Sequence, residues 1–165
     1  MLPKLWVRSV YDIDLEELNR MGIRGILADL DNTLVGAKEA AATPELGAWL
    51  TDVRSSGLKV AVISNNAERR VRAFAEPLQL PFVSRARKPL GGSFVKALAM
   101  LELRPEEAAI VGDQMMTDVL GGNRLGLYTI LVDPIARTDE GWMTRHVNRN
   151  LERAFLRRLR KKGWL

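Results

Sequence analysis

Short apolar runs alternate with longer amphipathic stretches along most of the chain, and this alternation constrains the fold more than any other feature. The apolar runs are rich in Val, Ile and Leu and have the length of strands; they cover residues 25–30, 58–63, 82–84, 108–112 and 128–132. The stretches between them have the spacing of helices that bury one face. Continuous apolar strands that alternate with helices are typical of a parallel sheet covered on both faces. The pattern therefore predicts an α/β domain.

The predicted helices begin at recognisable residues. Thr43 is expected at the N-cap and Pro44 at the first position of a helix that runs to about residue 56, since the Thr hydroxyl accepts from the first turn and Pro fits there. Asp12 or Asp14 is expected to cap a short helix that ends near residue 20. The remaining helices are predicted over residues 67–76, 92–103 and 116–124.

The composition excludes several classes of protein. The chain has 165 residues, 47% hydrophobic and 27% charged, which is ordinary for a single globular domain. It has no cysteine, so neither a disulfide framework nor a thiolate metal site is available. The N-terminus lacks the apolar stretch of a signal peptide, and no run approaches the roughly 18 apolar residues of a spanning helix. We therefore expect a cytoplasmic protein, with peripheral attachment to the inner face of the membrane left open.

Two carboxylates, Asp29 and Asp31, stand two positions apart where the first apolar run ends. Side chains two apart on a strand point to the same side, but this pattern breaks where the strand ends. Acids crowded at an apolar strand end are unfavourable unless a cation or a reaction needs them. One carboxylate can then act as a nucleophile while the other reaches the leaving group. The alternative is a turn in which the acids and Asn32 are ordinary turn residues.

Further polar residues follow the other predicted strands. Ser64 ends the second run, Lys88 follows the third, and Asp113 and Asp118 follow the fourth. Taken singly, each has a structural alternative: a turn or cap for the serine, the surface for the lysine, and a helix N-terminus for the acids. Together they fall at the carboxyl ends of successive strands, where ligands bind in parallel sheets. The convergence predicts one site at that edge.

Taken in order, Asp-x-Asp-x-Thr, Ser, Lys and Gly-Asp-x-x-x-x-Asp resemble the four motifs of the haloacid dehalogenase-like (HAD) phosphatases. The resemblance extends to one branch, the YqeG family, a bacterial family related to mitochondrial and plastid phosphatidylglycerophosphate phosphatases. The similar stretches are residues 22–26, 29–35, 86–89, 112–114 and 117–124, within a match from Leu2 to about Arg158. The resemblance implies a Rossmann-like sheet of strand order 3-2-1-4-5, with the strand before Asp29 at its centre.

The resemblance also implies roles for the motif residues. Asp29 would be the nucleophile, and Asp31 would protonate the departing alkoxide and then activate water. A phosphate dianion repels a carboxylate, so a cation is needed; Mg²⁺ would be held by Asp29, the backbone carbonyl of Asp31 and Asp113. Phosphate binding would fall to Asn32, Ser64, Asn65 and Lys88, and supporting roles to Thr33 and Asp118.

The spacing between the motifs leaves no room for a cap domain. Leu34 leads to the Thr43 helix within a few residues, and the segment from Ser64 to Lys88 holds only one helix and a short strand. A site without a cap is open, so its substrate can be large. The candidates are a lipid head group, a phosphoprotein, a nucleic-acid end, or a small molecule enclosed by a neighbouring subunit.

The C-terminal segment carries most of the net charge. Residues 145–165 hold eight Lys or Arg and one acid, Glu152, a net charge of +7, whereas the whole chain carries +5. We therefore expect a phosphatase domain over residues 1–144 and a basic amphipathic helix over 145–165. Arg145–Lys162 could lie on an anionic membrane, or the apolar stripe of the helix could dock on the domain. Nucleic acid is an unfavoured partner, because no binding module or interleaved aromatic residues accompany the charge.

These observations predict a Mg²⁺-dependent phosphomonoester hydrolase, and the family resemblance points to phosphatidylglycerophosphate as its substrate. One alternative is a HAD phosphatase acting on a nucleic-acid end, a phosphoprotein or a small phosphoester. Another is a non-catalytic RNA- or partner-binding module on the same fold. Loss of Asp29 or Asp31 would mark the last case, and both are present together with Lys88 and Asp113.

Overall fold

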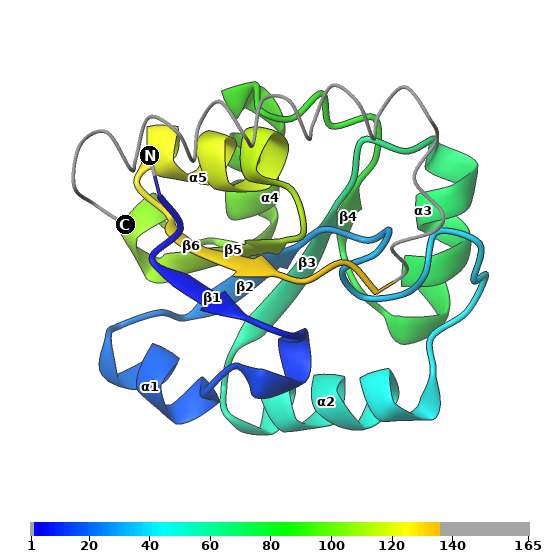
Figure 1. The fold of residues 1–165 in the computed structure, drawn as a ribbon, viewed down its shortest axis with the longest axis horizontal. Coiled ribbons are helices and arrows are strands. Elements are labelled where there is room, and N and C mark those ends of the chain that lie inside the picture. Colours follow the sequence, from blue (N-terminus) through cyan, green and yellow to red (C-terminus); the bar gives the residue numbers. More distant parts are fainter. Residues whose placement is uncertain (1, 136–165) are drawn as a thin grey trace.

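The computed structural model describes residues 2–135 and arranges them around one sheet of parallel strands (Figure 1). The strands are β1 (Leu5–Val7), β2 (Gly25–Ala28), β3 (Lys59–Ile63), β4 (Phe82–Val83), β5 (Ala108–Gly112) and β6 (Tyr128–Val132). Their spatial order is β1-β6-β5-β2-β3-β4. The predicted basic helix of residues 145–165 and the domain boundary before it lie outside the described residues.

The five predicted strands lie in the predicted order, with β2 between β3 and β5. The sheet also has an edge strand that was not predicted, β1, which pairs with β6 so that Leu5 lies opposite Ile130. Its three residues are too few to show a periodicity, and Trp6 at its centre is 64% exposed. The strand β2 ends at Ala28, short of the predicted residue 30, so Asp29 is the first residue beyond it.

The helices are α1 (Leu15–Arg20), α2 (Pro44–Ser55), α3 (Glu68–Ala75), α4 (Gly91–Leu101) and α5 (Leu120–Leu125), with short 3-10 turns η1 (Val10–Asp12), η2 (Glu76–Leu78) and η3 (Pro105–Glu107). Two predicted caps are confirmed: Asp14 accepts from the first turn of α1, and Thr43 Oγ1 accepts from Leu46 N at 3.2 Å. The helix predicted over residues 116–124 is instead a π-helical turn, η4 (Met115–Val119), that continues into α5.

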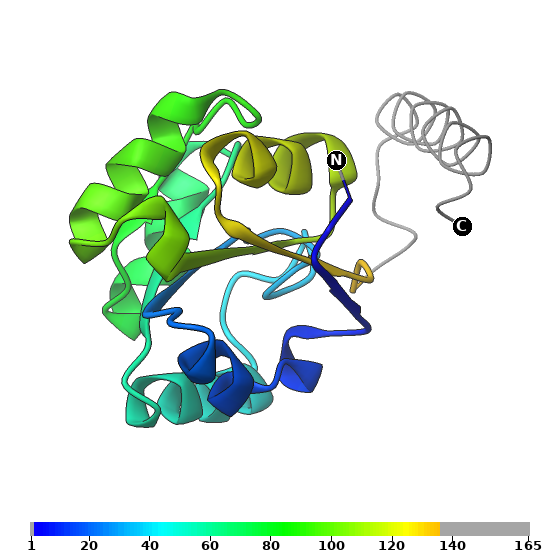
Figure 2. The ribbon, with the colours of Figure 1, turned by 90° about the vertical axis from the view of Figure 1, so that its left-hand side faces the viewer.

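Apolar side chains cover both faces of the sheet. On one face, α1, α2 and α3 contribute to a core that includes Val53 and Phe74 together with Val60 of β3. On the other face, α4 packs through Phe94 and Leu98, with α5 beside it. Figures 1 and 2 show α1 and α2 on the opposite side of the sheet from α4 and α5. Burial on both faces explains why the strands read as continuous apolar runs.

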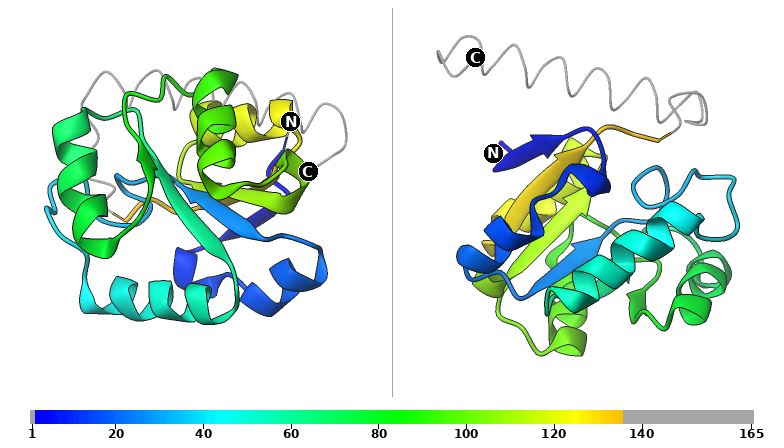
Figure 3. Two further views of the ribbon diagram at one scale, coloured as in Figure 1. Left: turned by 180° about the vertical axis from the view of Figure 1, so that it is seen from behind. Right: turned by 90° about the horizontal axis from the view of Figure 1, so that it is seen from below.

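The carboxyl edge of the sheet carries short connections that leave it accessible. Residues 29–43 lead to α2, residues 64–67 to α3 and residues 84–90 to α4, and none of these connections contains a cap domain, as predicted. Figure 3 shows the light-blue loop after β2 reaching beyond the end of the sheet toward α3. Within residues 2–135, no helix is long and apolar enough to cross a membrane.

Candidate active site

The loop after β2 separates the two predicted acids. Asp29 still belongs to the sheet through its backbone, since its N–H donates to Val111 O at 2.9 Å. The chain then turns sharply: Asn32 has a left-handed φ of 64°, and its N–H donates to Val35 O at 2.6 Å. Asn tolerates this backbone conformation better than most residues. As a result Asp29 and Asp31 make separate sets of contacts.

Lys88 lies between two carboxylates in the buried part of the site. Its Nζ is 2.6 Å from Asp29 Oδ1 and 2.6 Å from Asp118 Oδ1. Burial opposes the charge of the lysine, but the carboxylates of Asp118 and Asp29 outweigh it and raise the pKa of Lys88 above its ordinary value. Lys88 is therefore a permanent buried cation rather than the surface lysine that its position before a proline would suggest.

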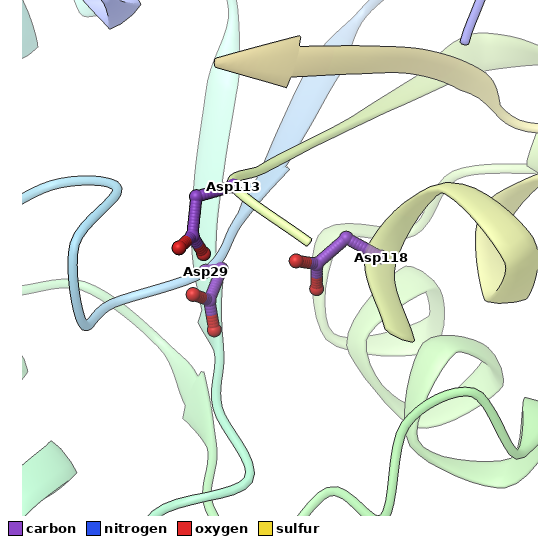
Figure 4. A group of neighbouring side chains, drawn as sticks. All are labelled: Asp29, Asp113 and Asp118. Atoms are coloured by element: carbon purple, nitrogen blue, oxygen red, sulfur yellow. The ribbon is translucent and has the colours of Figure 1, made fainter. Parts of the chain in front are cut away.

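Three carboxylates gather at this place in the site, and Figure 4 shows them together. One oxygen each of Asp29, Asp113 and Asp118 lies within 4.8 Å of the others. Burial raises the pKa of Asp29 to about 6, although Lys88 opposes the shift, and burial with the nearby charges of Asp29 and Asp118 raises the pKa of Asp113 to about 8. Thr33 Oγ1 lies 3.4 Å from an oxygen of each of Asp29 and Asp113, in the predicted supporting position. Within residues 2–135, Lys88 is the one cation that forms an ion pair with this cluster, so two acids with raised pKa leave the cluster short of positive charge.

The cluster fits a hard divalent cation. Both oxygens of Asp118 are engaged, one by Lys88 and the other by the N–H of Gln114 at 3.3 Å, which agrees with a supporting role. Thr33 Oγ1 approaches Asp29 Oδ2 and Asp113 Oδ1 at 3.4 Å each, so these two oxygens make weak contacts with Thr33. Magnesium prefers carboxylate and carbonyl oxygens of this kind. The residues present therefore suit the predicted metal.

A pocket of about 300 Å³ opens beside the cluster and brings the predicted phosphate-binding residues together. It is lined by Asp29, Asp31, Asn32, Ser64, Asn65, Asn66, Lys88, Gln114 and Thr117. The Asn65 side chain is fixed by Lys88, whose backbone N–H donates to Asn65 Oδ1 at 2.7 Å. Asn32 Oδ1 is buried without a hydrogen-bond partner among the described residues. A buried polar atom of this kind is suited to an additional ligand. A larger hollow of about 400 Å³, between α3, β4 and α4, contains none of these residues.

Two residues that the sequence analysis missed hold Asp31. Asn66 Nδ2 donates to Asp31 Oδ2 at 2.9 Å, and Arg70 donates to Asp31 Oδ1 through Nη2 at 3.1 Å and Nε at 3.3 Å. The only signal for Arg70 in the sequence is its position beside Val71, which begins the buried stripe of α3. Arg69 and Arg72 have the same chemistry nearby, so sequence alone could not select Arg70.

Gly112 is required by the position of Asp118. A Cβ atom at residue 112 would lie 2.2 Å from Asp118 Cγ, and that side chain is buried and paired with Lys88. We therefore expect Gly112→Ala to displace Asp118, to lower kcat/KM by about 10²-fold and to cost about 1–3 kcal/mol of stability. Steady-state kinetics and urea unfolding would measure both effects. The matched control is Gly47→Ala in α2, where an added Cβ meets nothing within 4 Å; equal behaviour of the two variants would contradict the argument.

Asp113 should destabilise the metal-free protein. Its folded pKa of about 8 exceeds its ordinary value of 3.8, so between these values the folded state binds more protons than the unfolded state. The free energy of unfolding therefore falls as the pH rises through this window. We expect Asp113→Asn to raise the stability in EDTA at pH 8 by about 0.5–2 kcal/mol and to abolish Mg²⁺-dependent hydrolysis. Thermal unfolding at pH 5 and pH 8 tests this, and a variant that loses as much stability as the parent between the two pH values would contradict it.

A parallel sheet of this order, with acids and a lysine gathered at its carboxyl edge, defines a HAD-like hydrolase, and residues 85–140 match the HAD-hydrolase-like family. The chain is 47% identical over 162 residues to the probable phosphatase YqeG of Bacillus subtilis, a match that covers 98% of this chain and 93% of that protein. The chain therefore belongs to the YqeG family and is a HAD-type phosphatase.

More distant relatives match over different shares of their length. Phosphatidylglycerophosphate phosphatase 1, chloroplastic/mitochondrial, of Arabidopsis thaliana is 30% identical over an alignment of 172 residues, which covers 99% of this chain but 49% of that protein. Among solved structures, 3-deoxy-D-manno-octulosonate 8-phosphate phosphatase from Yersinia pestis superposes with a TM-score of 0.54 at 16% identity, over 73% of this chain and 76% of that chain. At such identity the structural likeness shows the fold alone.

Proposed function

We propose that this phosphatase hydrolyses phosphomonoesters through a covalent aspartyl-phosphate on Asp29, with Mg²⁺ as its cation. The proposal rests on the different surroundings of two acids in the same pocket, Asp29 and Asp31. The Asp29 carboxylate is buried against Lys88 and the Asp113 carboxylate, whereas Asp31 is held apart by Asn66 and Arg70. Such a difference in surroundings suits one acid to attack and the other to proton transfer.

In the first step, a carboxylate oxygen of Asp29 attacks phosphorus and the bond from phosphorus to the leaving oxygen breaks. Asp31 gives its proton to that oxygen, so the alcohol departs neutral. In the second step, Asp31 takes a proton from a water molecule, whose oxygen attacks phosphorus and releases phosphate and the free carboxylate of Asp29. Lys88 keeps its charge throughout and stabilises the phosphoryl oxygens, as fixed charges in a buried site do. Ser64, Asn65 and Asn32 complete the pocket around the phosphoryl group.

Asp29, Asp113 and the backbone carbonyl of Asp31 are the proposed protein ligands of the metal. When bound, Mg²⁺ would offset the negative charge of the phosphate and of the two carboxylates. The position of Asp113 supports this assignment, because its carboxylate is buried with one oxygen within 4.8 Å of oxygens of Asp29 and Asp118, where a cation would offset the gathered negative charge.

The proposed substrate is phosphatidylglycerophosphate, which would yield phosphatidylglycerol. The similarity to the Arabidopsis thaliana enzyme supports this, as does the absence of a cap over the pocket within residues 2–135. Two exposed apolar side chains belong to segments that adjoin pocket residues: Leu90, two residues after Lys88, is 61% exposed, and Ile135, whose N–H donates to Asn32 O at 3.0 Å, is 51% exposed. Arg87, whose carbonyl accepts from Leu90 N, is also exposed. Exposed apolar and basic groups on segments next to the pocket suit a lipid head group presented at an anionic surface.

The experiment that tests the substrate is phosphate release from phosphatidylglycerophosphate in anionic vesicles, with Mg²⁺ and with EDTA. We expect metal-dependent release from the lipid. Release from soluble phosphoesters but none from the lipid would overturn the lipid assignment and leave the phosphatase, and would favour a small-molecule, phosphoprotein or nucleic-acid-end substrate.

The basic C-terminal segment is proposed to add attachment to the membrane. Deleting residues 149–165 should spare hydrolysis of a small soluble phosphoester and weaken hydrolysis on anionic vesicles, because each basic residue near such a surface contributes up to about 1 kcal/mol. Rates on the two substrates at several salt concentrations would measure this. Equal losses on both would assign the segment a structural role.

A further inference from the structure

The carboxylate of Asp31 is held on both of its oxygens by the segment that follows β3. Asn66 donates to Oδ2 at 2.9 Å, while Arg70 donates to Oδ1 through two of its nitrogens at 3.1 and 3.3 Å. A carboxylate fixed at one oxygen can still rotate about its last torsion, whereas contacts to both oxygens oppose that rotation. Asn66 and Arg70 therefore define the direction in which Asp31 faces the pocket.

Both donors are themselves fixed by their surroundings. The Asn66 side chain is oriented by its own Oδ1, which accepts from Ala67 N at 2.7 Å, and its backbone N–H donates to Ser64 Oγ at 3.1 Å. Arg70 lies in the first turn of α3, which is anchored on the sheet by the buried side chains of Val71 and Phe74. The orientation of Asp31 is thus set by β3 and α3 rather than by its own loop.

Arg70 differs from the other basic residues near the pocket in what it contacts. It also donates to Gly36 O at 3.4 Å, but it does not line the pocket, whereas Asp31 and Asn66 do. Its side chain is 19% exposed and pairs with no other acid in the described part of the chain. Arg70 therefore reaches the reacting groups only through Asp31.

We propose that Arg70, with Asn66, is a positioning residue that aims Asp31 at the leaving-group oxygen of the substrate. This rests on the proposed function, in which Asp31 transfers the proton. General acid catalysis contributes about 10²–10⁴-fold, and a displacement of about 1 Å can remove 10²-fold of a rate. The contribution depends on the leaving group, because an alkoxide needs the proton and a nitrophenolate leaves without it.

The test compares kcat/KM for an alkyl phosphate, glycerol 3-phosphate, and for 4-nitrophenyl phosphate, in the full chain and in Arg70→Gln. We expect the variant to lose about 10–10²-fold on the alkyl ester and less than about threefold on the nitrophenyl ester. The matched control is Arg69→Gln, because Arg69 precedes Arg70 on α3, is exposed, and its side chain forms no hydrogen bond or ion pair with another described residue. It should leave both values unchanged.

A second pair of variants links the effect to Asp31. In an Asp31→Asn background, Arg70→Gln should add no further loss on the alkyl ester, and Asn66→Ala alone should show the same leaving-group dependence as Arg70→Gln. Arg70→Lys should restore part of the alkyl activity, since it keeps one donor but not the paired contact.

Other outcomes would overturn the inference. If Arg70→Gln lowered kcat/KM equally on the two esters, Arg70 would only maintain the fold of the loop. The same conclusion would follow if the losses caused by Asp31→Asn and Arg70→Gln multiplied in the double variant. A KM raised equally for both esters would mean that it binds the phosphoryl group directly. If the unaltered protein released phosphate from neither ester and also none from phosphatidylglycerophosphate vesicles, the proposed function itself would fail; if it hydrolysed both esters and the variants failed the comparison, only the positioning role would.

Discussion

Replacing Asp29 with Asn should reduce phosphate release by about 10⁴–10⁶-fold, the range seen when a nucleophile is removed, and leave the protein folded. The amide has nearly the same shape as the carboxylate, so the contact with Lys88 can remain while the attacking oxygen is lost. Lys88 also keeps its pair with Asp118. Since burial raises the pKa of Asp29 to about 6, removing its charge should not lower the free energy of unfolding above that pH. Phosphate release with Mg²⁺ and thermal unfolding in EDTA would measure the two effects.

A matched control distinguishes the loss of the nucleophile from the general effect of removing one negative charge. Asp52→Asn changes an exposed acid on α2 and should alter neither activity nor stability. Rapid acid quenching during turnover should trap phosphate covalently on the parent protein and none on Asp29→Asn. Residual turnover of more than about one part in a hundred, or a trapped phosphate on the variant, would remove Asp29 from the role.

Most of the candidate site could be predicted because its residues follow apolar runs. Parallel strands end at one edge, so Asp29, Ser64, Lys88 and Asp113 converge there whatever the details of the helices between them. The same runs predicted five strands, and the family resemblance implied their order. The edge strand β1 was not predicted because it is short and half exposed. The π-helical turn before α5 was not predicted because apolar periodicity does not distinguish one hydrogen-bonding pattern of a helix from another.

The hydrogen-bond partners of Asp31 could not be predicted from the sequence, for a different reason. Asn66 and Arg70 meet it only because α3 begins beside the loop after β2, and the rotation of that helix is set by the burial of Val71 and Phe74. Neighbouring arginines are chemically equivalent in the sequence; Arg72 turns instead to Glu68 and Glu76. Tertiary geometry determines which residues can act through another side chain. Sequence motifs identify mainly the residues that contact the reacting group.

Lys88→Met should be the most damaging single change to both activity and stability. It leaves Asp29, Asp113 and Asp118 buried together without the cation that contacts two of them. Removing one partner of a buried ion pair typically costs about 3–5 kcal/mol, because the other charge remains without compensation. Loss of the fixed charge beside the phosphoryl group should lower kcat/KM by about 10²–10³-fold or more. Urea unfolding and kinetics at pH 8 would measure both, with Lys96→Met on the exposed side of α4 as the control.

The pH dependence of this variant follows from the sign of each shift. In the parent, the pKa of Lys88 is raised, so its stabilising charge is present throughout neutral pH and is lost only as the pH rises through that raised value. In the variant, Asp29 and Asp113 lose the cation that holds their pKa values down, so the raised pKa of each rises further and the folded state takes up protons that the unfolded state does not hold. Its stability should therefore be close to that of the parent near pH 5 and fall steeply toward pH 8, with part of the loss restored by Mg²⁺. A deficit independent of pH would instead mean that Lys88 contributes mainly by packing.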